Sequence, residues 1–120
     1  MMNTAADVAI AAAMGDKTAQ SMARAARACG MAYRYAGRAG VRLGDVDAIY
    51  SQAKARGGYG GAEHWAQQAE WWAMMAAMDA RRIRRARRRG LPTADDMELL
   101  LEAVRGATRA DGYAHGKDTK

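Results

Sequence analysis

Residues 62–89 read AEHWAQQAEWWAMMAAMDARRIRRARRR. The stretch has no proline or glycine and consists mostly of Ala, Arg, Met, Gln and Glu, which are strong helix formers. Gly60 and Gly61 precede it and Gly90 follows it, so the pattern predicts a single helix over 62–89. At about 1.5 Å per residue such a helix is roughly 42 Å long, more than the expected width of a folded chain of this size. We therefore expect a central helix with one projecting end.

The apolar side chains of this helix fall on two neighbouring faces. When successive residues are placed 100° apart around the helix axis, these apolar side chains form two stripes. The first contains Trp65, Ala69, Trp72, Ala76, Ala80 and Ile83, and the second contains Trp71, Met74 and Met78. Core packing is the first interpretation, because stripes at helical spacing are usually interior. The alternative is a docking surface, since unbranched thioethers repack around varied partners.

Arginines crowd the end of the same stretch. Seven of them occupy residues 81–89: Arg81, Arg82, Arg84, Arg85, Arg87, Arg88 and Arg89. The rest of the chain has 12 basic and 13 acidic residues, so the net charge of +6 is local. Beyond the turn that follows, Asp95, Glu98 and Glu102 fall on the polar side of the next predicted helix, away from its apolar stripe of Met97, Leu100, Leu101 and Val104, and are expected to face solvent. Such a patch suits phosphate, an anionic membrane surface or an acidic protein.

Shorter helices are predicted on both sides of the central one. Thr4 with Asp7 and Thr93 with Asp96 have the spacing of capping boxes, and Asp45 can begin a helix between them. A further helix is expected after Asp16, although Gly30 interrupts its pattern. We predict an all-α fold, a small bundle of four to five helices around the helix 62–89. Residues 1–105 form a single helical domain in this interpretation, and the polar, glycine-containing residues 106–120 form a disordered tail.

The composition predicts a thin hydrophobic core. Leu, Ile and Val number 12 together and Phe is absent, so alanine, methionine, tryptophan and tyrosine must fill the interior. We expect marginal stability, which favours self-association into a homo-oligomer or folding onto a partner.

Few features suggest catalysis or metal binding. Cys29 is the single cysteine, His64 and His115 are isolated, and serine occurs only at positions 21 and 51. We expect no enzymatic activity, no cofactor and no metal site. The start of the chain lacks the basic region of a signal peptide, and no apolar run approaches the 18 residues of a transmembrane segment. A cytoplasmic location is the expectation.

Residues 56–61, RGGYGG, resemble a single unit of the RGG boxes of RNA-binding proteins. Those boxes act by repetition, and this copy joins two predicted helices. We interpret it as a flexible linker.

The favoured hypothesis is non-enzymatic nucleic-acid binding, largely independent of sequence. The seven arginines of residues 81–89 would contact phosphates of DNA or RNA, and Arg38, Arg42 and Arg56 would extend the surface. The alternative is a protein-binding role as an assembly subunit or an inhibitor of a larger complex. In that case the arginines would engage an acidic patch of the partner, beside apolar contacts from Trp65, Trp71, Trp72, Met74 and Met78.

Overall fold

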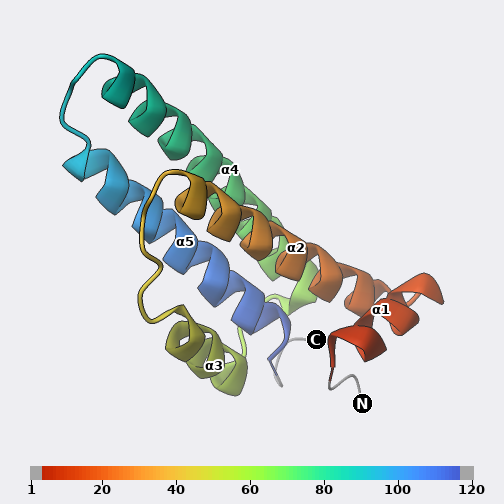
Figure 1. The fold of residues 1–120 in the computed structure, drawn as a ribbon. Helices are drawn as coiled ribbons and strands as arrows, with labels where there is room; N and C mark the ends of the chain where they lie inside the picture. Colours follow the sequence, from red (N-terminus) through yellow and green to blue (C-terminus); the bar gives the residue numbers. More distant parts are fainter. Residues whose placement is uncertain (1–3, 117–120) are drawn as a thin grey trace.

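The computed structural model describes residues 4–116 of the 120-residue chain. It contains five helices in this range and no strand (Figure 1). They are α1 (Ala5–Ala13), α2 (Lys17–Arg38), α3 (Val46–Arg56), α4 (Gly61–Arg88) and α5 (Ala94–Ala114). The predicted all-α bundle around one long helix is confirmed.

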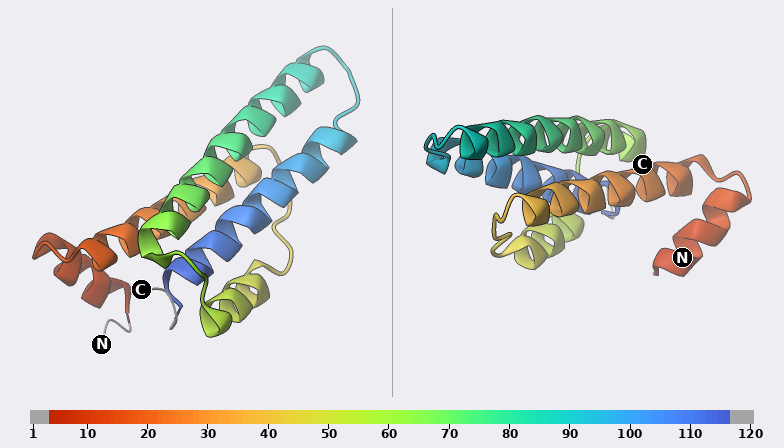
Figure 2. Two further views of the ribbon diagram at one scale, coloured as in Figure 1. Left: turned by 180° about the vertical axis from the view of Figure 1, so that it is seen from behind. Right: turned by 45° about the horizontal axis from the view of Figure 1, so that its top comes forward.

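Helices α4 and α5 form a long antiparallel hairpin, and the other helices pack around it. Helix α2 lies against both α4 and α5, α3 lies against α5, and α1 packs on α2. The bundle is elongated, with extents of 50 × 26 × 22 Å. Figure 2 shows the end of α4 and the start of α5 extending beyond α2, so the last turns of α4 have fewer neighbours. No helix of residues 4–116 has both the length and the hydropathy needed to cross a lipid bilayer.

Two of the predicted helix starts, at Thr4 and Asp16, have a side-chain cap, whereas those at Asp45 and Thr93 have none. The Thr4 hydroxyl accepts a hydrogen bond from the backbone N–H of Asp7 at 3.1 Å, and Asp16 accepts one from Ala19 at 2.8 Å. The capping box predicted at Thr93 does not form, because the Thr93 hydroxyl points to the sulfur of Met97 at 3.5 Å. The start of α5 therefore has no side-chain cap, although Asp95 and Asp96 lie in its first turn.

The core consists largely of alanine, as the composition indicates. Ile83, Leu100, Val104 and Thr108 are the largest fully buried side chains among the described residues. Around them α2, α4 and α5 contribute buried alanines, which allow the helix axes to approach closely. The apolar side of α5 faces this core, since Leu100 and Val104 are buried and Met97 and Leu101 pack against the same cluster.

The prediction of a disordered tail from Gly106 is wrong for the residues that the structure describes. Helix α5 continues to Ala114, and most of its residues from 106 onward are buried. A Cβ atom at Gly106 would lie 2.4 Å from the indole of Trp72, and one at Gly112 would lie 2.6 Å from the Cβ of Ala53. These glycines permit close packing inside a helix. Residues 117–120 of the predicted tail lie outside the described range.

The glycine-rich segment before α4 is also packed. Gly58 is buried, and a Cβ atom there would lie 2.1 Å from Nε1 of Trp65. Gly57 and Gly60 have φ values of 68° and 101°, which other residues rarely adopt. The segment is a tight connection between α3 and α4, with only Tyr59 fully extended into solvent.

Candidate functional site

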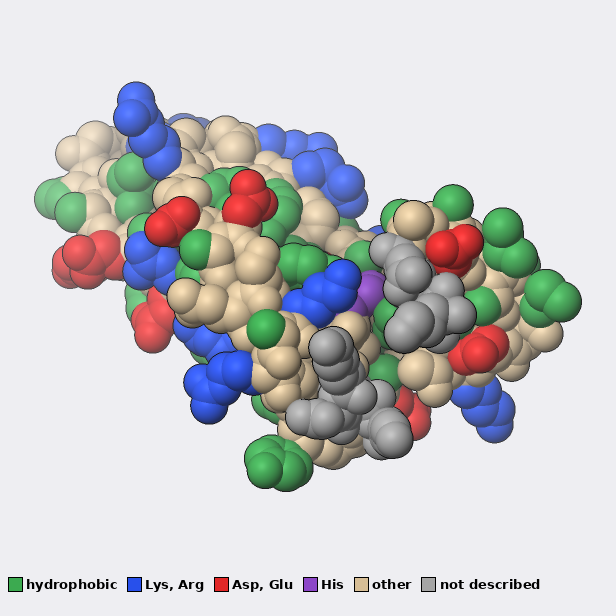
Figure 3. Space-filling model, turned by 90° about the horizontal axis from the view of Figure 1, so that it is seen from below, with side chains coloured by type: hydrophobic (Ala, Val, Ile, Leu, Met, Phe, Trp, Pro, Cys, Tyr) green, Lys and Arg blue, Asp and Glu red, His purple; other side chains and the backbone are tan. Residues whose placement is uncertain are grey.

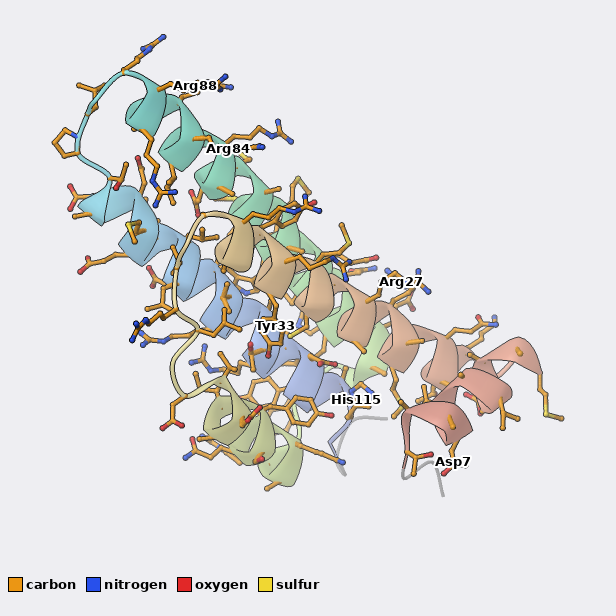
Figure 4. The ribbon with its side chains drawn as sticks, viewed as in Figure 1. Asp7, Arg27, Tyr33, Arg84, Arg88 and His115 are labelled. Atoms are coloured by element: carbon orange, nitrogen blue, oxygen red, sulfur yellow. The ribbon has the colours of Figure 1, made fainter. Side chains whose placement is uncertain are left out.

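The end of α4 carries a dense group of exposed cations, here called the arginine cluster. Its members are Arg81, Arg82, Arg84, Arg85, Arg87, Arg88 and Arg89, and every one of them is exposed. Within the same turns Ile83 is the one fully buried side chain, and it holds this part of α4 against α2 and α5. Figure 4 shows Arg84 and Arg88 on the outer side of α4, directed away from α5.

Few internal groups neutralise this charge. Within residues 4–116, the single ion pair of the cluster joins Nη1 of Arg82 to Oδ1 of Asp79 at 3.7 Å. Nη2 of Arg87 donates a hydrogen bond to the backbone carbonyl of Ala39 at 2.7 Å. Arg87 therefore satisfies a carbonyl at the end of α2, a structural role that its sequence position did not indicate. The other five arginines form no ion pair with the part of the chain that the structure describes.

The acids that follow in the sequence do not change this balance. Asp95, Glu98 and Glu102 are exposed on α5 and form no ion pair within the described range. Asp79 is buried, and this burial raises the pKa of its carboxyl group, although the charge of Arg82 opposes the shift. The cluster thus presents exposed guanidinium groups with few ionised carboxylates in contact with them. Such a local excess of positive charge attracts an external anion.

Of the three arginines predicted to extend the cluster, the structure places Arg38 beside it. Arg38 borders a small recess between α2 and α4 together with Arg81 and Arg84. Arg42 lies in the connection between α2 and α3. Arg56 ends α3 and lines a different recess with Arg109, between α3 and α5.

Two arginines of α2 were not among the predicted site residues. Arg24 and Arg27 line a groove between α2 and α4 that continues toward Arg38. The available signal was their spacing: Arg24, Arg27, Arg34 and Arg38 fall on one side of a helix. What could not be read from that spacing is that this side lies next to α4.

The five predicted partner-contact residues divide into two groups. Trp72 packs over Gly106, and the Trp65 ring lies 4.6 Å from that of Tyr113, so both belong to the interior. Trp71, Met74 and Met78 remain 49%, 59% and 41% exposed. Core packing is therefore the correct interpretation of the first stripe, and the second stripe is a free surface in the monomer.

A buried polar group joins α2 to α5. The Thr108 hydroxyl donates to the carbonyl of Val104 at 2.7 Å, so it accepts from the Tyr33 hydroxyl at 3.0 Å and from the Cys29 thiol at 3.8 Å. Burial raises the pKa of Cys29 and that of Tyr33. A raised thiol pKa is the opposite of what activates a cysteine nucleophile.

A half-buried histidine, His115, contacts the end of α5. Nδ1 of His115 is 3.2 Å from Oδ1 of Asp111. Burial lowers the pKa of His115, but its contacts with the side chain and backbone of Asp111 outweigh this and raise the pKa overall. Within residues 4–116 no group of three or more His, Cys, Asp or Glu side chains is arranged to hold a metal ion.

The fold and its surface thus define a small all-α bundle with one strongly cationic end. Comparisons of the chain with protein-family models, with curated proteins and with solved structures found no match.

Proposed function

We propose that this protein binds nucleic acid without catalysis, through phosphate contacts made by the arginine cluster. One observation supports the proposal above all: seven exposed arginines surround the last turns of α4, and in the described residues only Arg82 has a carboxylate partner. Guanidinium groups present forked donors that match phosphate oxygens, and such contacts carry little sequence information. Binding is therefore expected to be largely independent of sequence.

The number of available contacts predicts the salt dependence. Five arginines of the cluster have no internal ion pair or hydrogen bond within the described range, and Arg38 stands beside them, which makes six. Each phosphate contact on duplex DNA contributes about −0.9 to the slope of log K against log salt. We expect a slope near −5 for a duplex and a smaller one for a single strand.

The test compares two variants that lose the same charge. The first changes Arg81, Arg84, Arg85 and Arg88 to glutamine, and the control changes Arg42, Lys54, Arg56 and Arg109 to glutamine. All eight residues are exposed. Lys54 and Arg56 belong to α3, Arg42 lies in the connection before it, and Arg109 of α5 lines a recess with Arg56. Figure 3 shows acidic and basic side chains interspersed on the face of the molecule seen from below. This control also examines whether Arg42 and Arg56 extend the binding surface.

The measurement is fluorescence anisotropy with labelled random-sequence duplex DNA, single-stranded DNA and RNA in about 50 mM salt. We expect the cluster variant to lose about a hundredfold or more in affinity and its slope to fall by about 3 to 4. The control is expected to change affinity far less. No binding by the parent protein at this salt concentration, or an equal loss in both variants, contradicts the proposal.

The second candidate function is protein binding, which the exposure of Trp71, Met74 and Met78 favours. Exposed, clustered apolar side chains beside a cationic surface are typical of docking sites. Changing both Trp71 and Met78 to alanine is expected to release a partner or dissolve an oligomer while the monomer stays folded. A light-scattering mass, with and without nucleic acid, measures both outcomes.

A further inference from the structure

A groove of about 340 Å³ runs between α2 and α4. Its floor is made by Ala28, Ala73 and Ala77, and its walls carry Met31, Tyr35 and Met74. The groove exists because alanines bring the two helices close while the longer side chains stand on either side. Figure 2 shows the two helices side by side over most of the length of α2.

Six of the nine residues that line the groove are apolar or aromatic. Methionine side chains on both walls can adjust to the shape of an occupant. Met74 is 59% exposed and Met31 is exposed as well, and the apolar surface continues on α4 to Trp71. Monomers rarely leave such a connected apolar surface uncovered without a binding function.

The border of the groove is positively charged. Arg24 and Arg27 lie at one end, and Glu70 is the one acid there, already paired with Arg24. At the other end Tyr35 and Ala77 also line the next recess, which Arg38, Arg81 and Arg84 surround. Figure 4 shows Arg27 and Arg84 on the same flank of the bundle. An occupant therefore needs an apolar side for the floor and negative charge for the border.

We infer that the α2/α4 groove binds an acidic amphipathic helix of a partner protein. A helix laid along two parallel neighbours inserts the side chains at positions i, i+3 or i+4, and i+7 into the space between them. Its flanking carboxylates then face the arginines on both borders. This inference deepens the protein-binding candidate and does not depend on nucleic-acid binding.

Two other occupants fit less well. A second copy of this chain brings a net charge of +6 and the same arginines to the interface, which is electrostatically unfavourable. Nucleic-acid bases need polar partners or stacked aromatic rings, whereas the floor consists of alanines and the walls provide a single aromatic ring, Tyr35.

The test uses three hydrocarbon-stapled, fluorescent 18-residue peptides and the full chain. The first has leucines at every third or fourth position and glutamates elsewhere. The second replaces the glutamates by lysines, and the third replaces the leucines by serines. At about 100 mM salt we expect the acidic leucine peptide to bind at least tenfold more tightly than either control.

Two protein variants locate the binding. Met31→Gln with Met74→Gln keeps the size and charge of the groove while making its walls polar. Both positions are exposed, so folding is not at risk. We expect at least a tenfold loss of peptide affinity and a change in nucleic-acid affinity of less than twofold. Arg27→Gln with Arg38→Gln is expected to weaken the acidic peptide in a salt-dependent manner.

Several results overturn the inference. If the serine peptide binds as tightly as the leucine peptide, the attraction is between charges alone and the apolar groove plays no part. In a second such result, Met31→Gln with Met74→Gln leaves the peptide affinity unchanged, while Trp71→Ala with Met78→Ala abolishes it. Protein binding then occurs on the outer face of α4, so the groove is refuted as the site but the protein-binding function is not. Nucleic-acid binding lost in Met31→Gln with Met74→Gln assigns the groove to nucleic acid.

Discussion

The two ends of α4 belong to one continuous helix but are held in place differently. From Gly61 to Ala80, Trp65 and Trp72 press onto glycines of neighbouring segments and a row of alanines faces α2 and α5. From residue 81 to 89, Ile83 is the only buried side chain, and Arg87 adds one hydrogen bond to the end of α2. The first part is packed along its whole length, whereas the second depends on Ile83 for its packing and presents charge on its other sides. Stability and ligand binding are therefore expected to respond to different substitutions.

The largest expected effect is that of Ile83→Ala. Ile83 is the one large anchor of the cationic end, and removing its buried methyl groups leaves a cavity that costs about 3 kcal/mol of unfolding free energy. Urea denaturation followed by circular dichroism measures it. Met78→Ala, an exposed position on the same helix, serves as the matched control and is expected to cost less than about 1 kcal/mol. Equal effects at the two positions contradict the packing described for Ile83.

Gly106→Val is expected to destabilise the protein by about 2 kcal/mol. The new side chain meets the indole of Trp72, and overpacking of this kind forces ring and backbone to shift. The control is Gly30→Ala in α2, where a Cβ atom meets nothing within 4 Å. That variant is expected to gain about 0.5 to 1 kcal/mol from helix propensity. A stabilising Gly106→Val variant in the same denaturation assay is evidence against the contact between α4 and α5.

Asp79 lies at the boundary between the two parts of α4, and its burial is expected to make the stability of the protein depend on pH. Burial raises the pKa of its carboxyl group above the usual 3.8, so the folded state binds the proton more tightly than the unfolded state. Stability from this group is thus lost as the pH rises from about 3.8 through the raised pKa. Asp79→Asn is expected to be more stable than the parent at pH 7, with a smaller difference at pH 4. A less stable variant at pH 7 means that the ion pair with Arg82 outweighs the burial.

Arg85→Gln has the smallest expected effect, and it stabilises the protein. Arg85 has like charges three or four residues away on both sides, at Arg81, Arg82, Arg88 and Arg89. Relief of this repulsion is worth a few tenths of a kcal/mol at low salt and disappears in about 1 M salt. Thermal melts at the two salt concentrations measure it. A destabilised variant indicates that Arg85 has a favourable partner after all.

Much of α4 could be predicted because its signals are local. The absence of helix breakers and the spacing of Ile83, Ala80 and Ala76 determine a helix and its inner side. The choice between the Trp72 stripe and the Trp71 stripe could not be made in this way, since both are apolar. It depends on where α2 and α5 lie, which is a property of the folded chain.

The errors have the same origin. Gly106 and Gly112 look like loop residues in the sequence, whereas Trp72 and the α3 backbone need the space that they leave. The same limit applies to the candidate site. The arginines of residues 81–89 are visible as a run, but Arg24 and Arg27 join the site only because α2 lies beside α4.

The position of Cys29 makes the chain convenient for spectroscopy. Its sulfur is enclosed between α2 and α5, and its raised pKa keeps the reactive thiolate scarce at neutral pH. A cysteine placed at an exposed position such as Tyr59 would then take up a maleimide dye selectively, with no need to remove the native one. With a second dye on a bound nucleic acid or peptide, the labelled protein would then allow distances between the two dyes to be measured.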